Sequence, residues 1–242
     1  MEFHDAFYPD PELGRDEQEE MQRTVAARAV FEDRFDWQEP DVVAGIDQAF
    51  VGNEQAVSAA VVLQDGEVVE RVRAAEPLRT PYIPGLLALR EGEAIVSVLE
   101  RMDADPDLLM LDGSGRIHFR QAGIATHIGV YADVPAVGVA KNLLCGEPEQ
   151  DLDQAFEQGT RIPVHADHSV ENLDDEVIGY AYQSKQFDDT SSRSINPLLV
   201  SPGHRVGNGT AVNLVEAFCD GYKLPEPTRL ADRYCDEVKE AR

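Results

Sequence analysis

The sequence predicts a mixed α/β fold in which one sheet combines antiparallel and parallel strands and carries helices on both faces. Three β-like runs come first, and short linkers with hairpin turn chemistry join them. Helices and strands then alternate along the rest of the chain. Hairpin-linked strands form an antiparallel meander, whereas strands separated by helices usually pair in parallel. The length of 242 residues suits a single domain spanning residues 1–242.

The N-terminal segment, residues 1–35, is predicted to be helical and to pack on or beside the core. Its charged run 11–35 offers four candidate inward positions, which are Leu13, Met21, Val25 and Val30. The three strands of the meander follow, at residues 42–50, 55–63 and 67–75.

After the meander, a proline-rich element at residues 81–85 leads into a helix that continues to about residue 102. A short apolar run at 108–111 predicts a buried strand. The later elements are expected to be a helix at 123–131, strands at 136–140, 177–183 and 198–201, and a helix at 210–222. The acidic final segment is a candidate for one more helix.

Composition excludes several classes of protein. Apolar residues make up 43% of the chain, which is too many for an acidic disordered protein. No run approaches the roughly 20 apolar residues of a membrane span, and the acidic N-terminus does not resemble a signal peptide. Three cysteines form no CxxC pair, so we expect reduced thiols and no zinc site. We therefore expect a cytoplasmic protein without a membrane partner, and a monomer.

The net charge of the chain is strongly negative, which would repel a polyanion in dilute salt. There are 46 Asp and Glu residues against 21 Lys and Arg, a formal net charge of −25. This negative charge has two interpretations: the chain is an acidic partner-binding protein, or it is adapted to concentrated cytoplasmic salt. The acids are scattered along the chain, which favours the second. In molar salt the Debye length is only about 3 Å, so diffuse repulsion largely disappears.

Three carboxylates occupy positions where chemistry is plausible. Asp47 interrupts an apolar strand, and Glu91 lies within the apolar stripe of a helix, where an unpaired carboxylate is costly. Asp112 ends a buried strand and precedes two glycines that permit close backbone approach. Each could instead be a solvated acid at the margin of its element. Together they could bind a hard divalent cation, Mg²⁺ or Mn²⁺.

Basic residues near these acids are further candidates. His118 lies in a glycine-bounded loop, and Lys141, one of only four lysines, follows the strand at 136–140. His204 stands at a similar change from strand to turn. An ordinary surface lysine and satisfied structural histidines are the alternatives.

These segments resemble the endonuclease V family and follow the family's order across roughly residues 40–215. The matching segments are AGID at 44–47, PYIPGLLALREG at 81–92, DGSG at 112–115 with His118, GIATHIGV at 123–130, GVAK at 138–141 with LLCG at 143–146, and SPGHR at 201–205. The second and third are specific in combination. Gln48, Phe119 and Gln121 depart from the family's usual residues, which leaves fine substrate preference open.

The resemblance implies a ribonuclease H-like fold and hydrolysis of a strand one nucleotide beyond deoxyinosine, on its 3′ side. The implied cofactor is Mg²⁺, with Mn²⁺ as a substitute. The implied metal residues are Asp47, Glu91 and Asp112, with His204 completing the acidic cluster. His118 and Lys141 are implied near the scissile phosphate.

The resemblance also implies how damaged DNA, single or double stranded, is bound. The family's wedge, which fills the gap left by an extruded base, is matched by Pro81, Tyr82, Ile83 and Pro84. Its base pocket is matched in part by Gly113, Gly123 and Ile124. A candidate contact to the nucleic-acid backbone is Arg90. The alternatives are an inosine-specific RNA nuclease, a structure-specific nuclease on the same fold, and a non-catalytic acidic binding protein.

Overall fold

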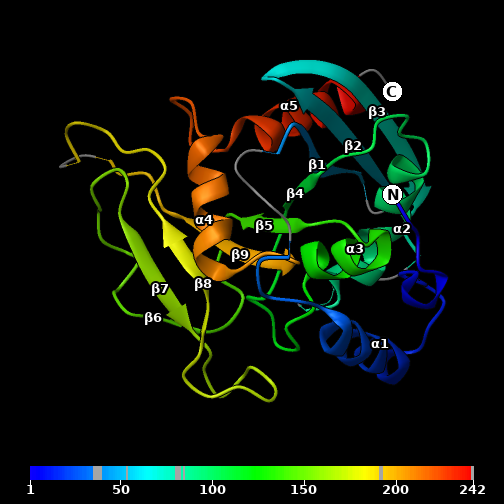
Figure 1. The fold of residues 1–242 in the computed structure, drawn as a ribbon, viewed down its shortest axis with the longest axis horizontal. Coiled ribbons are helices and arrows are strands. Elements are labelled where there is room, and N and C mark those ends of the chain that lie inside the picture. The colour runs from blue at the N-terminus through cyan, green and yellow to red at the C-terminus, as the bar shows by residue number, and fades with distance from the viewer. Residues whose placement is uncertain (35–39, 53, 80–82, 84, 191–192, 241–242) are drawn as a thin grey trace.

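The computed structural model describes residues 1–242 apart from 35–39, 53, 80–82, 84, 191–192 and 241–242. Its described residues form a sheet in the order β3-β2-β1-β4-β5-β9-β8-β7-β6 (Figure 1). The predicted antiparallel meander is present as β1 (Val42–Val51), β2 (Gln55–Gln64) and β3 (Glu67–Pro77). Each linker in this meander is short enough to keep consecutive strands adjacent.

The parallel part of the sheet lies at its centre. β4 (Leu108–Asp112) pairs in parallel with β1 and with β5 (Ala136–Ala140). The carboxyl ends of β4 and β5 therefore lie beside the middle of β1, close to Asp47. The remaining strands are antiparallel: β9 (Leu198–His204) pairs with β5, followed by β8 (Val177–Tyr182), β7 (Arg161–His165) and the short β6 (Glu147–Pro148). The predicted mixed sheet is confirmed.

Helices cover both faces of the sheet, as predicted. α2 (Leu87–Leu99) and α3 (Ile124–Ala132) pack on one face, against a core that includes Ala44 and Ile46 of β1. α4 (Asn208–Ala217) packs on the other face, against a core that includes Val43. Because side chains alternate along a strand, even-numbered positions of β1 face α2 and odd-numbered positions face away from it.

The last helix, α5 (Glu226–Glu240), lies on the odd-numbered face of β1 and contacts the backbone of that strand. A Cβ atom on Gly45 would lie 2.1 Å from the carbonyl carbon of Pro227, so only glycine permits this approach. The buried Cys235 thiol donates a hydrogen bond to the Asp47 carbonyl at 3.2 Å. The docking of α5 is therefore close and specific to the middle of β1.

The N-terminal helix α1 (Arg15–Arg28) is shorter than the helical segment predicted for residues 11–35. Val25 is buried as predicted, but Leu13 and Met21 are only partly buried. The other fully buried residues of α1 are Gln18 and Gln22. Polar side chains can take such positions where they find hydrogen-bond partners, and Gln22 finds two, described below.

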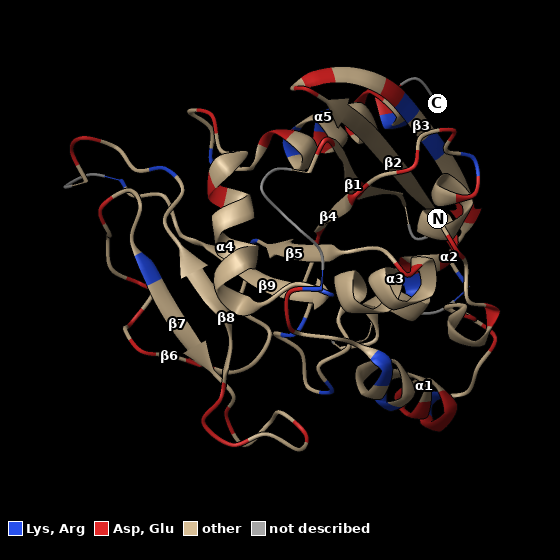
Figure 2. Ribbon diagram, viewed as in Figure 1, with Lys and Arg blue, Asp and Glu red and all other residues tan. Residues whose placement is uncertain are grey.

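Acidic side chains are distributed over the helices, loops and strands, whereas basic ones are sparse (Figure 2). Within the ranges that the structure describes, every helix is too short or too polar to cross a bilayer.

Candidate metal site and its cavity

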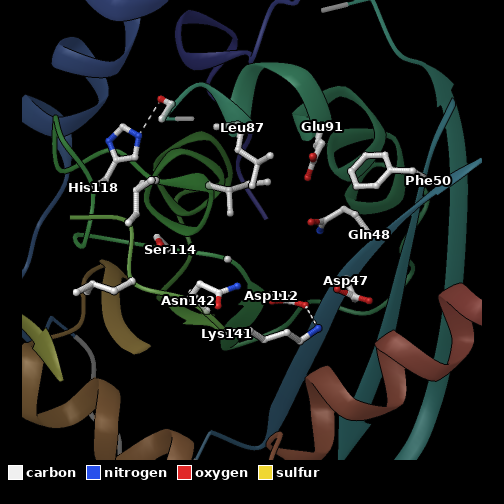
Figure 3. A pocket seen from close by; sticks show the side chains of 18 residues that line it. Asp47, Gln48, Phe50, Leu87, Glu91, Asp112, Ser114, His118, Lys141 and Asn142 are labelled. Atoms are coloured by element: carbon white, nitrogen blue, oxygen red, sulfur yellow. Dashed lines mark hydrogen bonds and ion pairs between the residues drawn. The ribbon is translucent and has the colours of Figure 1, made fainter. Parts of the chain in front are cut away.

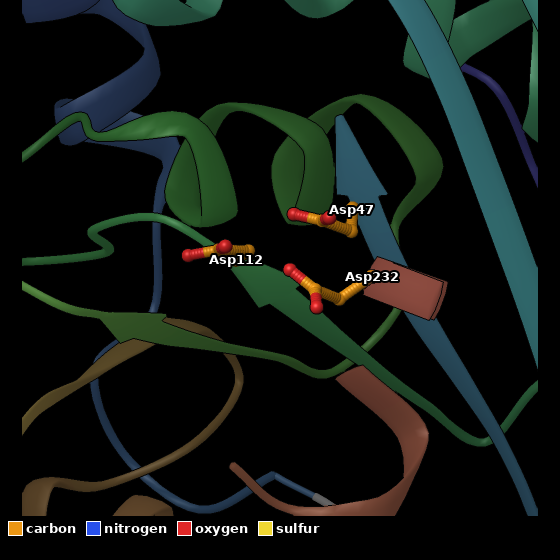
Figure 4. A group of neighbouring side chains, drawn as sticks. All are labelled: Asp47, Asp112 and Asp232. Atoms are coloured by element: carbon orange, nitrogen blue, oxygen red, sulfur yellow. The ribbon is translucent and has the colours of Figure 1, made fainter. Parts of the chain in front are cut away.

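Three carboxylates from distant parts of the chain meet where the carboxyl end of β4 lies beside the middle of β1. Asp47 comes from β1, Asp112 from the end of β4 and Asp232 from α5 (Figure 4). One oxygen from each lies within 4.8 Å of the other two. Ordinary repulsion would separate three ionised acids, so this arrangement is suited to a cation.

Asp47 is the most buried member, with 6% of its surface exposed. Burial, and then the neighbouring charge of Asp112, raise the pKa of Asp47 well above its ordinary value. Holding this group ionised therefore costs free energy unless positive charge is nearby.

Lys141, just after β5, supplies one positive charge to the cluster. Its Nζ lies 2.7 Å from Asp112 Oδ2, a contact drawn in Figure 3, and 3.5 Å from Asp232 Oδ1. Partial burial alone would lower the pKa of Lys141, but Asp112, Asp47 and Asp232 outweigh it and raise the pKa above the ordinary value. One ammonium does not balance three carboxylates, so the cluster keeps negative charge that a divalent cation would neutralise.

Glu91 reaches the same region from the opposite face of the sheet. It lies on α2, which packs against the even-numbered positions of β1, whereas Asp47 is odd-numbered. Figure 3 shows Glu91 across Gln48 from Asp47 and Asp112. Glu91 is 3% exposed, and burial raises its pKa to about 8 against the lowering effect of Arg90. It is thus outside the tight group of three but faces the same cavity.

The cavity has a volume of about 420 Å³ and joins the acids to the glycine-rich loops. Gly113, Gly123 and Ile124 line it, as do both Asp112 and Lys141. Gly113 has φ +138°, and a Cβ atom there would meet Ile124 Cγ2 at 2.4 Å. Glycine at this position therefore permits the close contact between the loop after Asp112 and Ile124 in the cavity wall.

His118 is buried in the wall of this cavity and both of its ring nitrogens have backbone partners. Its Nε2 lies 2.9 Å from the Gly85 carbonyl, and Nδ1 accepts from the Arg120 amide at 3.2 Å. These contacts assign the proton to Nε2. Burial lowers the pKa of His118 to about 4. His118 is therefore a neutral group that holds Gly85 in place.

A second buried side chain converges on the same carbonyl. Gln22 of α1 donates from Nε2 to the Gly85 oxygen at 2.6 Å, and Arg120 donates to Gln22 Oε1 at 3.1 Å. The N-terminal helix is thereby connected to the cavity wall just before α2.

His204 does not lie in this cavity, contrary to expectation. β9 runs antiparallel to β5, so His204 pairs with Ala136 at the amino end of β5, opposite to Lys141. Its ring is 3.4 Å from Asp133 Oδ1 and accepts the Val30 amide at 3.2 Å. It connects α3 with the N-terminal segment, and Asp232 occupies the position by the acids that His204 was expected to fill.

The remaining predicted substrate-binding residues are only partly visible. Pro81, Tyr82 and Pro84 lie outside the described residues, and Ile83 is partly buried. The Arg90 guanidinium lies over the Phe50 ring, 5.1 Å from its centroid, and Phe50 lines the cavity.

Asp232 escaped the sequence-based prediction, although a signal was present. The buried positions of α5 include Thr228, Ala231, Cys235 and Val238, a helical stripe. Asp232 follows Thr228 by four positions and precedes Cys235 by three, so it borders this stripe. The same argument singled out Glu91, but the dense charge of the final segment concealed the stripe.

Comparisons with known proteins identify sequences and structures that are similar to this chain. A sequence model described as endonuclease V matches residues 23–233. The chain is 56% identical to an endonuclease V of Haloarcula marismortui and 54% identical to one of Natronomonas pharaonis, covering 96% of this chain and 95% of each relative. The structure resembles human ENDOV with a TM-score of 0.80 at 30% identity, covering 94% and 99% of the two chains. It also resembles a Ciona intestinalis endonuclease V in complex with DNA containing an inosine followed by a ribo-adenosine, with a TM-score of 0.75 at 25% identity over 94% and 98%.

Proposed function

The chain belongs to the endonuclease V family, and we propose that this endonuclease uses Mg²⁺ to nick DNA one nucleotide beyond deoxyinosine, on the 3′ side. The observation that carries the proposal is the meeting of Asp47, Asp112 and Asp232 beside a cavity lined by glycine loops. The parallel pairing of β1 with β4, which brings Asp47 and Asp112 side by side, supports the proposal.

The donor set fits a hard divalent cation. Three carboxylate groups offer oxygen ligands, and among the described residues no histidine or cysteine joins them in a metal-binding group. Asp47, Asp112 and Asp232 would hold the ion, with Glu91 facing it from across the cavity. When bound, Mg²⁺ would activate water and offset negative charge on the phosphodiester, and Mn²⁺ would substitute.

The side chains around the acids have separate tasks in this proposal. Lys141 presents an ammonium beside Asp112, where it would stabilise charge that develops on the phosphate oxygens. His118 is a positioning residue, because its proton is committed to the Gly85 carbonyl. Arg90, anchored on Phe50, would contact the strand backbone.

The cavity would receive the extruded base. Gly113, Gly123 and Ile124 line the space between the acids and the loop, and about 420 Å³ is sufficient for a small ligand. Extruding a base costs a few kcal/mol, and less for a mispaired one. Pro81, Tyr82, Ile83 and Pro84 would fill the gap in the stack, with the two prolines limiting the entropy lost on ordering.

One observation supports RNA as a second substrate. The Ciona relative was crystallised with a ribonucleotide directly after the inosine. A ribose at that position presents a 2′-hydroxyl, the group by which proteins distinguish RNA from DNA.

The decisive experiment compares matched oligonucleotides that hold deoxyinosine, uracil, an abasic site or ribo-inosine, each with Mg²⁺ or with chelator. Deoxyinosine-specific nicking that requires Mg²⁺ and maps one nucleotide beyond the lesion would support the proposal. Preference for ribo-inosine would favour the RNA activity, and cleavage that ignores the lesion would contradict both.

A further inference from the structure

Two of the four lysines of this acidic chain lie close to Tyr222: Lys185 in space and Lys223 as its neighbour in the sequence. A third, Lys141, contacts Asp112 and Asp232 and is close enough to Lys223 for their charges to interact. We propose that Lys185, Tyr222, Lys223 and Arg229, here called the Tyr222 surface, hold the nucleic-acid strand where it passes out of the cavity. The inference rests on the proposed nuclease function and adds a strand-binding site to it.

The Tyr222 surface begins one helical turn from the acids. Arg229 precedes Asp232 by three residues on α5, a rise of about 4.5 Å along the axis. The guanidinium of Arg229 lies 4.3 Å from the centroid of the Tyr222 ring. Arg229 therefore links the ring of Tyr222 to the turn of α5 that carries Asp232.

Tyr222 is exposed in a manner unusual for this protein. Its side chain is 54% exposed, and it is one of only three large hydrophobic side chains exposed among the described residues. Lys185 Nζ lies 5.6 Å from the ring centroid, and Lys185 also donates to the Gly221 carbonyl. An exposed aromatic ring flanked by cations is the arrangement on which single-stranded bases stack in many nucleic-acid-binding proteins.

Lys223 provides the charge that a phosphate would meet. The segment is anchored by the Ser184 hydroxyl, which donates to the Lys223 carbonyl at 2.5 Å. Within the described part of the chain, no carboxylate lies within 4.0 Å of the Lys223 ammonium, although acids outnumber bases by more than two to one. Burial, and then the charge of Lys141, lower the pKa of Lys223, which agrees with a half-buried cation close to Lys141.

Charge complementarity selects nucleic acid as the occupant. Acidic residues outnumber basic ones by 46 to 21 and are spread along the ribbon (Figure 2), so a polyanionic strand is attracted most where cations are grouped. Arg229 is paired with Glu226 at 2.6 Å and lies against the ring. Lys185, which also donates to the Gly221 carbonyl, and Lys223 supply the charge for phosphates. The surface thus combines a stacking ring with two backbone contacts.

The test measures the binding of a lesion-free single-stranded oligonucleotide in EDTA across a KCl series. Lys223→Gln should reduce the slope of log affinity against log salt by about 0.7, the value for one lost phosphate contact on a single strand. Lys239→Gln, the same charge change at the exposed far end of α5, is the matched control and should leave the slope unchanged.

The aromatic contribution is tested separately. Tyr222→Ala should weaken binding by roughly 5- to 100-fold with little change in slope, and Tyr222→Phe should restore it, because the ring alone is needed to stack. Equal slopes for Lys223→Gln and Lys239→Gln, together with equal affinity of the Ala and Phe variants, would overturn the proposal. Lesion-dependent nicking by the wild type is scored independently, so failure of the nuclease function would be recognised as such.

Discussion

Glu91→Gln should stabilise the metal-free protein at neutral pH, although it removes a residue of the proposed site. Glu91 is 3% exposed, and burial raises its pKa from 4.5 to about 8. Between those pH values the folded protein keeps a proton that the unfolded chain has lost, so wild-type stability falls as pH rises. Glutamine has nearly the same shape and carries no such penalty.

The magnitude follows from the size of the shift. Each pH unit between the two pKa values corresponds to about 1.4 kcal/mol, so the variant should gain up to about 3 kcal/mol at pH 7 and almost nothing at pH 4.5. For a protein of this size that gain raises the thermal midpoint by roughly 5 to 10 °C. Divalent metal would reduce the difference, because it offsets the penalty in the wild type.

Thermal or urea unfolding in EDTA at fixed KCl, repeated from pH 4.5 to pH 8, measures the effect. The control is Glu100→Gln, which removes the same charge at the exposed end of the same helix. A difference between Glu91→Gln and wild type that does not grow with pH would refute the burial of an isolated carboxyl at this position.

The other predictions concern the acids, His118 and the surface charge. Asp47→Asn and Asp112→Asn should each abolish Mg²⁺-dependent nicking while circular dichroism stays native, and turnover by either variant at saturating Mg²⁺ would remove that residue from the mechanism. Asp232→Asn should raise the Mg²⁺ concentration for half-maximal nicking at least about tenfold, because one oxygen ligand loses its charge; an unchanged Mg²⁺ titration would place Asp232 outside the metal site. Burial lowers the pKa of His118 to about 4, so its contribution to stability is present above pH 6.5 and is lost as pH falls toward 4. His118→Gln should therefore make the free energy of unfolding less dependent on pH between 6.5 and 4. An unchanged pH dependence in this range would contradict the burial of His118 as a neutral group. Finally, stability should rise as KCl goes from dilute toward molar while affinity for DNA peaks at intermediate or high salt, whereas flat stability and steadily falling affinity would return the acidic surface to a partner-binding role.

Local patterns accounted for most of the fold. Alternating apolar residues and short turns predicted the meander, and the apolar run at β4 predicted its burial. The N-terminal helix was predicted too long because charge and helical spacing do not mark where a chain leaves a helix. Its buried Gln22 could not be foreseen, because its partner, the Gly85 carbonyl, lies far along the sequence.

The site was less predictable, and His204 and Asp232 show why. His204 resembles Asp112 locally, since both end an apolar strand, but the direction of β9 places it at the opposite edge of the sheet. Strand direction depends on pairing over long distances, which local pattern does not contain. Asp232 could be predicted only by knowing that α5 docks on β1. That contact depends on the absence of a side chain at Gly45.

The docking of α5 on β1 also determines when a newly made molecule can begin to act. Asp47 is made early, whereas Asp232 belongs to the last helix, 185 residues later in the chain of 242. At about 5 to 20 residues per second, roughly 10 to 40 seconds of synthesis pass between them. A nascent chain can fold its meander in that interval but lacks one of its three clustered acids. Synthesis itself therefore delays assembly of the three clustered acids until α5 has been made.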